Sequence, residues 1–237
     1  MLKKSSHRRN TGAFAALALA MFFSAVGLAA TQGQQHWTTE SVLRQLDHEA
    51  KGFHSLTASI EQTKVTVAVN DKSTETGQIS VRRDDKMRIE FTQPDARTIL
   101  RSGNDLYVYN PKLKRVEEYD LGKHRDLVDQ FLLLGFGTSG SELLKGYLPV
   151  MLGEETLDNR QVVKLELTPK SEEVRNQINK VHIWIDESTW LAVQQQFFET
   201  GGGDYFIIHY TNVVKNPNIS DDHFKPRWPK GVTHVKP

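Results

Sequence analysis

The chain has 237 residues, with 30 lysine and arginine side chains against 29 aspartate and glutamate side chains, and it has no cysteine. Its length suits one large domain or two small ones. The formal net charge of +1 argues against a broadly basic nucleic-acid binder. The absence of cysteine excludes disulfides, thiolate metal sites, a cysteine nucleophile and a lipid anchor attached through cysteine.

The first thirty residues have the three-part pattern of a secretory signal peptide. Lysines and arginines precede an almost wholly apolar stretch from Ala13 to Val26, and small residues follow up to Ala30. An uncleaved membrane anchor is the alternative, but the stretch is short and alanine-rich for a span, which needs about 20 apolar residues. We therefore expect residues 1–30 to be a cleaved signal peptide and residues 31–237 to form one secreted domain, which would be periplasmic in a double-membrane bacterium and outside the cell in other organisms.

The first half of that domain has a helix followed by short strands. Helical spacing of apolar residues predicts a helix over 38–53, and the pattern then changes to alternation with a period of two. Short turns between the strands are typical of an antiparallel meander and not of a parallel sheet. The expected strands lie within 56–69, 77–83, 87–91, 98–100, 106–109 and 115–119.

The middle of the chain interrupts this alternation with glycine and with helical spacing. We expect one helix over 127–134 and a second short helix that is capped by Ser141 and holds Leu143, Leu144 and Tyr147. Strands are expected again over 161–168, 179–185, 192–199 and 205–213. The sequence therefore predicts a mainly antiparallel β structure with helices (α+β), in which a helical insertion divides one large sheet.

No motif indicates an enzyme or a cofactor. Residues 135–140 match G-x-G-x-x-G, but the parallel βαβ context of a dinucleotide site is missing. Ser139 does not satisfy the G-x-S-x-G pattern. The histidines are scattered, and adjacent acidic residues such as Glu117 and Glu118 point to opposite faces of a strand. We expect no catalytic site, no metal and no cofactor.

Several strands carry continuous apolar rows that have two interpretations. One row is Met87, Ile89 and Phe91, and further rows lie within 163–167 and 181–185. These rows can be ordinary core, which any domain of this size needs. They can also line an apolar cavity beneath a helical lid, because half-open barrels hold small apolar ligands.

The order and spacing of several segments resemble those of the periplasmic outer-membrane lipoprotein carrier family, the LolA-like proteins. The first segment is Leu56-Thr-Ala-Ser-Ile-Glu-Gln62, and the second is Gly77-Gln-Ile-Ser-Val-Arg-Arg83 followed by Met87-Arg-Ile-Glu-Phe91. Ile99 to Gly103 and Leu106 to Pro111 continue the match. Segments at 165–170 and 229–232 also fit, so that the resemblance extends over nearly all of residues 38–233.

The resemblance implies an incomplete, strongly curved β-barrel with a helical lid over an apolar cavity. It implies a soluble, monomeric periplasmic carrier that shields the acyl chains of lipoproteins and delivers them towards the outer membrane. Its partners would be acylated lipoproteins or other lipids, an inner-membrane lipoprotein-releasing transporter and an outer-membrane acceptor. The chain departs from the family at Asp84, where proline is usual, and at Ile89 and Tyr107, where tryptophan is common. These departures leave the fold that the resemblance implies and bear on which cargo the protein binds.

The resemblance also suggests which residues form the site. Arg83 aligns with the arginine that donates hydrogen bonds to lid carbonyls in the family, and Arg82 beside it is an equally basic alternative. Burial of acyl chains needs apolar side chains, because each buried CH₂ contributes about 0.8 kcal/mol. The expected lipid-binding residues are Met87, Ile89, Phe91, Ile99, Tyr107, Tyr109, Leu132, Phe136, Leu144, Leu165 and Trp184.

Two other functions stay open at this point. A regulatory module that senses lipid or mislocalised lipoprotein would need the same cavity as a carrier. A secreted hydrolase acting on lipids or glycans would need a Ser/His/acid cluster, or a close pair of carboxylates, brought together by folding.

Overall fold

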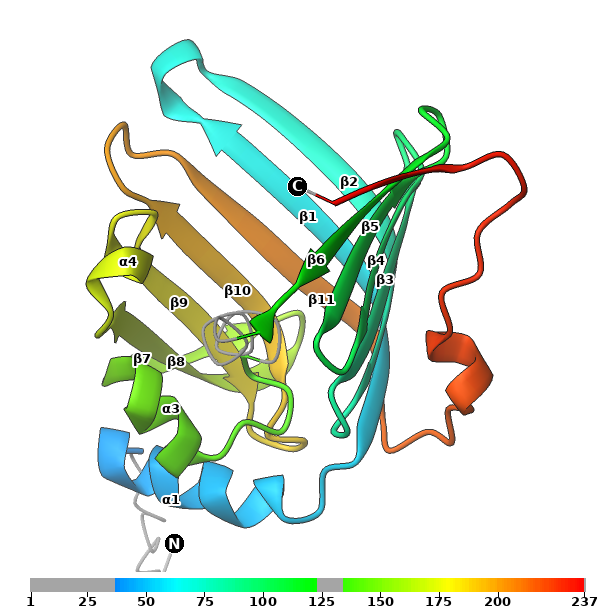
Figure 1. The fold of residues 1–237 in the computed structure, drawn as a ribbon. Coiled ribbons are helices and arrows are strands. Elements are labelled where there is room, and N and C mark those ends of the chain that lie inside the picture. Colours follow the sequence, from blue (N-terminus) through cyan, green and yellow to red (C-terminus); the bar gives the residue numbers. More distant parts are fainter. Residues whose placement is uncertain (1–36, 123–133, 237) are drawn as a thin grey trace, which may run out of the picture. The chain divides into compact units, whose positions relative to one another are not determined.

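The computed structural model describes residues 37–122 and 134–236 (Figure 1). In this part of the chain, twelve strands form one sheet in the order β12-β6-β5-β4-β3-β2-β1-β11-β10-β9-β8-β7, so that β12 and β7 are edges and the sheet stays open. The strands are β1 Ser55–Thr66, β2 Asp71–Arg82, β3 Lys86–Gln93, β4 Arg97–Ser102, β5 Asp105–Asn110, β6 Arg115–Asp120, β7 Tyr147–Leu157, β8 Arg160–Pro169, β9 Ile178–Asp186, β10 Ala192–Glu199, β11 Tyr205–Lys215 and β12 Thr233–Val235.

The helices are short, and two of them contact each other at one end of the strands (Figure 1). The first is α1, Thr39–Ala50, which begins at a capping box formed by Thr38 and Ser41. The second is α3, Gly140–Gly146, whose capping box uses Ser139 and Glu142, so the prediction that Ser141 caps it was wrong. The other helices of the described residues are α4 Glu172–Arg175 and the 3₁₀ turns η1 Val67–Val69 and η3 Asp221–Phe224.

Alternation along the strands gives the sheet two different faces. We call the face whose side chains pack with α1 and α3 the inner face. There, Val42 and Leu46 of α1 and Leu143 of α3 join one apolar cluster with the strand rows. The opposite, outer face carries charged side chains and a second, small cluster of Val162, Trp184 and Val193. The predicted antiparallel sheet with few helices is confirmed; only β12, which pairs with β6, is parallel in the described residues.

The C-terminal segment covers part of the outer face. The η3 turn packs on β3 and β4 and buries Phe224, and Trp228 lies 5.0 Å from the ring of Tyr109 (Figure 1, orange to red). Arg82 points to this face, where it donates to Asp84 at 2.6 Å and to Asp221 of the turn. These bonds hold the pKa of both carboxyl groups well below its usual range.

Strand β7 was missed by the sequence interpretation, and it forms a protected edge. Tyr147 donates its N–H to the carbonyl of Leu143, and Met151 donates its N–H to Thr39 Oγ1 at 2.9 Å. Pro149 between them has no N–H to offer. From Tyr147 to Met151 the backbone donors that would recruit a foreign strand are therefore used or missing, as is common at sheet edges.

Among the helices of residues 37–122 and 134–236, none is both long and apolar enough to cross a membrane. The expected signal peptide and residues 127–133 of the helix expected over 127–134 lie outside the described residues.

The attachment of the C-terminal segment should weaken in acid. Burial, together with the charge of Arg88, lowers the pKa of His223, which shares a 3.0 Å hydrogen bond with Ser80. Because an unfolded histidine has a pKa of about 6.5, protonation favours detachment. The docked tail is fully stabilised above that pH and becomes less stable as pH falls through the lower folded value. Hydrogen-exchange protection of residues 221–228 should therefore drop between neutral pH and pH about 5. A His223→Gln variant should show no such drop. Equal protection of the wild type at both pH values would contradict a role of His223 in holding the C-terminal segment.

Candidate functional site

The inner face is apolar over most of the sheet. On β1 to β3 its rows are Leu56, Ala58 and Ile60, then Ile79 and Val81, then Met87, Ile89 and Phe91, which the strand register places side by side. On β8 to β11 the rows continue with Val163, Leu165, Leu167, Val181, Ile183, Ile185, Ala192, Phe197, Phe206, Ile208 and Tyr210.

Two regions of this face differ in burial. Beside α1 and α3 the side chains are fully covered, as for Leu56 and Met87. Ile89, Ile99, Phe206 and Ile208 pack against the same cluster but stay partly exposed. An apolar surface that is continuous with the core yet incompletely covered is the feature of this molecule best suited to an apolar ligand.

Most of the residues expected to bind lipid lie on this face. Met87, Ile89 and Phe91 form the β3 row, and Ile99 lies opposite Ile89 on β4. Leu165 is fully buried on β8. Phe136, which precedes α3, packs edge-on against Tyr210 of β11 at 4.8 Å.

Other expected residues lie elsewhere, and these placements correct the sequence interpretation. The register pairs Tyr107 with Leu100 and Tyr109 with Thr98, so both tyrosines belong to the outer face, where they contact Trp228. Trp184 lies opposite Lys164 on the outer face. Leu144 is 43% exposed on α3, whereas its neighbour Leu143 joins the core. Leu132 lies outside the described residues.

Arg83 connects β2 with the two helices. Its backbone N–H donates to His54 O at 2.9 Å, and its guanidinium donates to the carbonyl of Ala50, the last residue of α1. Its Nη2 atom lies 3.9 Å from Glu142 Oε1 at the start of α3. Because Arg82 bonds Asp84 and the C-terminal turn on the outer face, Arg83 is the arginine of the pair that contacts the helices.

A buried polar chain holds the segment before α3 against the inner face, and no pattern in the sequence indicates it. Tyr210 donates to Gln195 Oε1 at 2.9 Å, and Gln195 Nε2 donates to the carbonyl of Leu134. Burial raises the pKa of the Tyr210 hydroxyl well above its ordinary range. A Cβ on Gly135, whose φ is +79°, would lie 2.5 Å from Ala192 Cβ, so this close approach requires glycine.

A polar group at the far end of the inner face was also missed. Arg97 Nη2 donates to Glu75 Oε2 at 2.8 Å, Gln62 Nε2 donates to the same oxygen at 3.5 Å, and the guanidinium lies 4.6 Å from the Phe91 ring centre. We call Gln62, Glu75 and Arg97 the rim cluster. The signal in the sequence is that each lies two residues from an inner apolar or glycine position, as Gln62 does from Ile60.

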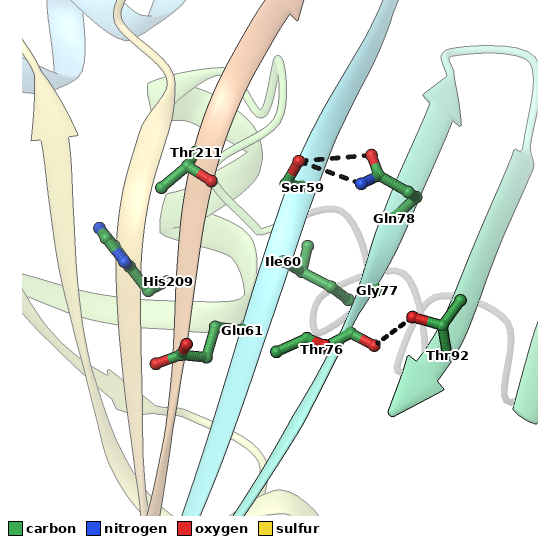
Figure 2. A pocket seen from close by; sticks show the side chains of 9 residues that line it. All are labelled: Ser59, Ile60, Glu61, Thr76, Gly77, Gln78, Thr92, His209 and Thr211. Carbon is green, nitrogen blue, oxygen red and sulfur yellow. Dashed lines mark hydrogen bonds between the residues drawn. The ribbon is translucent and has the colours of Figure 1, made fainter. Parts of the chain in front are cut away.

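The outer face holds a separate groove of about 360 Å³ across β11, β1, β2 and β3 (Figure 2). Figure 2 shows mainly polar side chains along it: Ser59 exchanges hydrogen bonds with Gln78, and Thr92 donates to the carbonyl of Thr76. Register shifts on both sides, at Thr57/Ser59 and Thr76/Gly77, accompany it. Its hydroxyl, amide and carboxylate lining does not suit acyl chains.

The described residues offer little for other chemistry. Ser139, the serine within the glycine motif, is engaged with Glu142 in the capping box of α3. In the part of the chain that the structure describes, no three histidine, aspartate or glutamate side chains gather as metal ligands would.

Comparisons with known proteins give a family and a fold. The family model described as outer membrane lipoprotein carrier protein LolA matches residues 51–227. The search of curated proteins found no match. An uncharacterized conserved protein from Thermus thermophilus has a TM-score of 0.56 at 11% identity, over 84% of this chain and 98% of its own.

Two further solved structures are similar at lower scores. A LolA superfamily protein, NE2245 from Nitrosomonas europaea, has a TM-score of 0.42 at 17% identity, over 80% of this chain and 98% of its own. MucB in the Pseudomonas aeruginosa MucA/MucB complex has a TM-score of 0.46 at 15% identity, over 80% of this chain and 61% of its own. Since the family model extends over most of the chain, this protein belongs to the LolA outer membrane lipoprotein carrier family.

Proposed function

We propose that this protein is a periplasmic carrier that shields the acyl chains of lipoproteins on its inner face and delivers them towards the outer membrane. The observation that carries this proposal is the apolar inner face, which passes from full burial beside α1 and α3 to partial exposure at Ile89, Ile99, Phe206 and Ile208. Membership of the carrier family supports it. The role is binding and transfer, without catalysis, and the partners are acylated proteins, a releasing transporter and an outer-membrane acceptor.

The energetics fit a shielding role. Each CH₂ group removed from water contributes about 0.8 kcal/mol, so a free acyl chain in water is strongly unfavourable. A surface that is continuous with the core can take up such a chain without burying polar groups. The open sheet, with β7 and β12 as edges, leaves that surface reachable.

Competition for an apolar dye tests the proposal. An environment-sensitive dye is bound to the purified protein, and a triacylated lipopeptide or the same peptide without acyl chains is then added. We expect displacement by the acylated peptide alone. If neither peptide displaces the dye, or if the dye does not bind, the inner face is plain core and the proposal fails.

Arg83 is expected to control retention of the cargo. Replacing it in Arg83→Leu removes the bond to the Ala50 carbonyl and the ion pair with Glu142. Because the side chain is 46% exposed, we expect little loss of stability but a change of about tenfold in the rate of lipopeptide release, the effect of one charge-assisted hydrogen bond. Stopped-flow transfer to vesicles measures it. Arg82→Leu, which affects only the outer face, is the matched control, and equal transfer rates in Arg83→Leu and wild type would remove Arg83 from this role.

A sensing role is the second candidate function, because a sensor and a carrier use the same acyl-binding surface. The observation that favours it is the firm attachment of the segment before α3, through the buried bonds from Tyr210 to Gln195 and from Gln195 to Leu134. A segment that is held firmly against the inner face favours retention of a ligand over its release. Transfer of the lipopeptide from this protein to acceptor vesicles favours the carrier, and tight retention without transfer favours the sensor.

A further inference from the structure

The inner face has a direction, because its polar and apolar side chains are separated along the strands. Following β1 from Gln62 through Ile60 and Ala58 to Leu56 leads from the rim cluster towards α1. Along β2 the same path runs from Glu75 to Val81, beside the arginine that contacts α1. Six residues of strand extend over about 20 Å, which is long enough for an extended acyl chain.

At the polar end, Arg97 still has donors to offer. It lies across the ring of the buried Phe91 and reaches Glu75. A guanidinium has five N–H donors. The Arg97 Nε atom is buried and has no hydrogen-bond partner among the described residues. A buried donor without a partner is costly. One third of the Arg97 side chain is exposed, so an acceptor on a bound ligand can approach the guanidinium.

The charges near the rim cluster are balanced. Glu75 neutralises Arg97 at 2.8 Å, and Lys64, the next inner residue along β1 from Gln62, pairs with Glu199 at 3.1 Å. A site with donors but without net positive charge suits a neutral carbonyl oxygen better than a phosphate, which would need an unpaired cation.

We propose that the rim cluster binds the ester or amide carbonyl groups at the head of the acylated ligand, while the acyl chains lie along the apolar rows towards α1. This inference rests on the proposed function and adds the orientation of the ligand and the class of its head. Arg97 is the main donor; Glu75 accepts from its guanidinium and holds it in place, and Gln62 donates to the same Glu75 oxygen.

Three probes that share their alkyl length test the head site. Dioctanoylglycerol has two ester carbonyls, its diether analogue di-O-octylglycerol has none, and dioctanoyl phosphatidate adds a phosphate. We expect the wild-type protein to bind the diester about tenfold more tightly than the diether, the contribution of one hydrogen bond from a charged donor. The phosphatidate should bind no more tightly than the diester.

Variants assign this preference to Arg97. In Arg97→Met we expect the diester to lose about tenfold in affinity while the diether is unaffected, since only the diester offers carbonyl acceptors. Arg97→Lys, which keeps the charge without the planar donors, should behave similarly. Arg88→Met is the matched control, because Arg88 pairs with Glu90 at 2.7 Å on the outer face of the neighbouring strand.

The outcomes separate this inference from the proposed function. Equal binding of diester and diether by the wild type, equal losses for both probes in Arg97→Met, or tighter binding of the phosphatidate would each overturn the head site and leave acyl binding intact. Failure of all three probes to displace the dye would contradict acyl binding itself.

Discussion

A carboxylate at the centre of the inner face should abolish acyl binding. Ile89 lies between Ile79 of β2 and Ile99 of β4, partly exposed and packed against the core. In Ile89→Glu an acyl chain on this row would have to bury an unpaired charge, which is far more costly than the gain from one methylene. We expect the affinity for an apolar dye and for the triacylated lipopeptide to fall at least about 100-fold.

The control for this variant lies on the adjacent strand. Gln78→Glu introduces the same charge on the exposed outer face of β2, and it should leave dye binding unchanged. Circular dichroism and thermal melting should show that both variants stay folded, because Ile89 is not fully buried. Normal dye binding by a folded Ile89→Glu protein would place the acyl site elsewhere.

The largest loss of stability is expected at a glycine between two central strands. A Cβ on Gly77 would lie 2.1 Å from Glu90 O and 2.8 Å from Phe91 Cα, which are backbone atoms of β3. The β2–β3 register shifts at Thr76/Gly77. In Gly77→Ala the two strands must move apart or change register, so we expect the free energy of unfolding to fall by about 3 kcal/mol or more.

Denaturant unfolding measures this effect, and a second glycine provides the comparison. Gly202 lies in the β10–β11 turn, where the nearest atom to an added Cβ is Asp204 Oδ1 at 3.9 Å. Gly202→Ala should therefore shift the unfolding midpoint little. Equal midpoints for Gly77→Ala and wild type would show that the strands tolerate a side chain at this crossing.

The strands that the sequence predicted are those with clear alternation. β3 and β9 alternate apolar and polar residues and lie within one or two residues of their expected ranges. β7 was not predicted, because it has apolar side chains on both faces: Leu148, Val150 and Leu152 on the outer face, and Tyr147 and Met151 on the inner face. Its sequence therefore shows no period of two. Both faces of that strand are apolar, and alternation alone cannot identify it.

Polarity alone also could not predict which side chains of the candidate site face the ligand. Along β5, Leu106 and Val108 alternate with Tyr107 and Tyr109, and either pair could face the ligand on the basis of polarity. The inner face takes Leu106 and Val108, because the C-terminal segment covers the tyrosines from outside with Trp228. A contact between residues more than a hundred positions apart in the chain decides the matter, and local sequence carries no sign of it.

Photocrosslinking at two adjacent residues of β4 tests the central claim most directly. Ile99 lies on the inner face and Thr98 on the outer face, opposite Ile89 and Glu90 respectively. The photoreactive residue p-benzoylphenylalanine replaces either Ile99 or Thr98. Each variant is then irradiated in the presence of the triacylated lipopeptide. We expect a crosslink from position 99, lost when the peptide lacks acyl chains, and none from position 98. Equal crosslinking from both positions, or crosslinking from position 98 alone, would contradict acyl binding on the inner face.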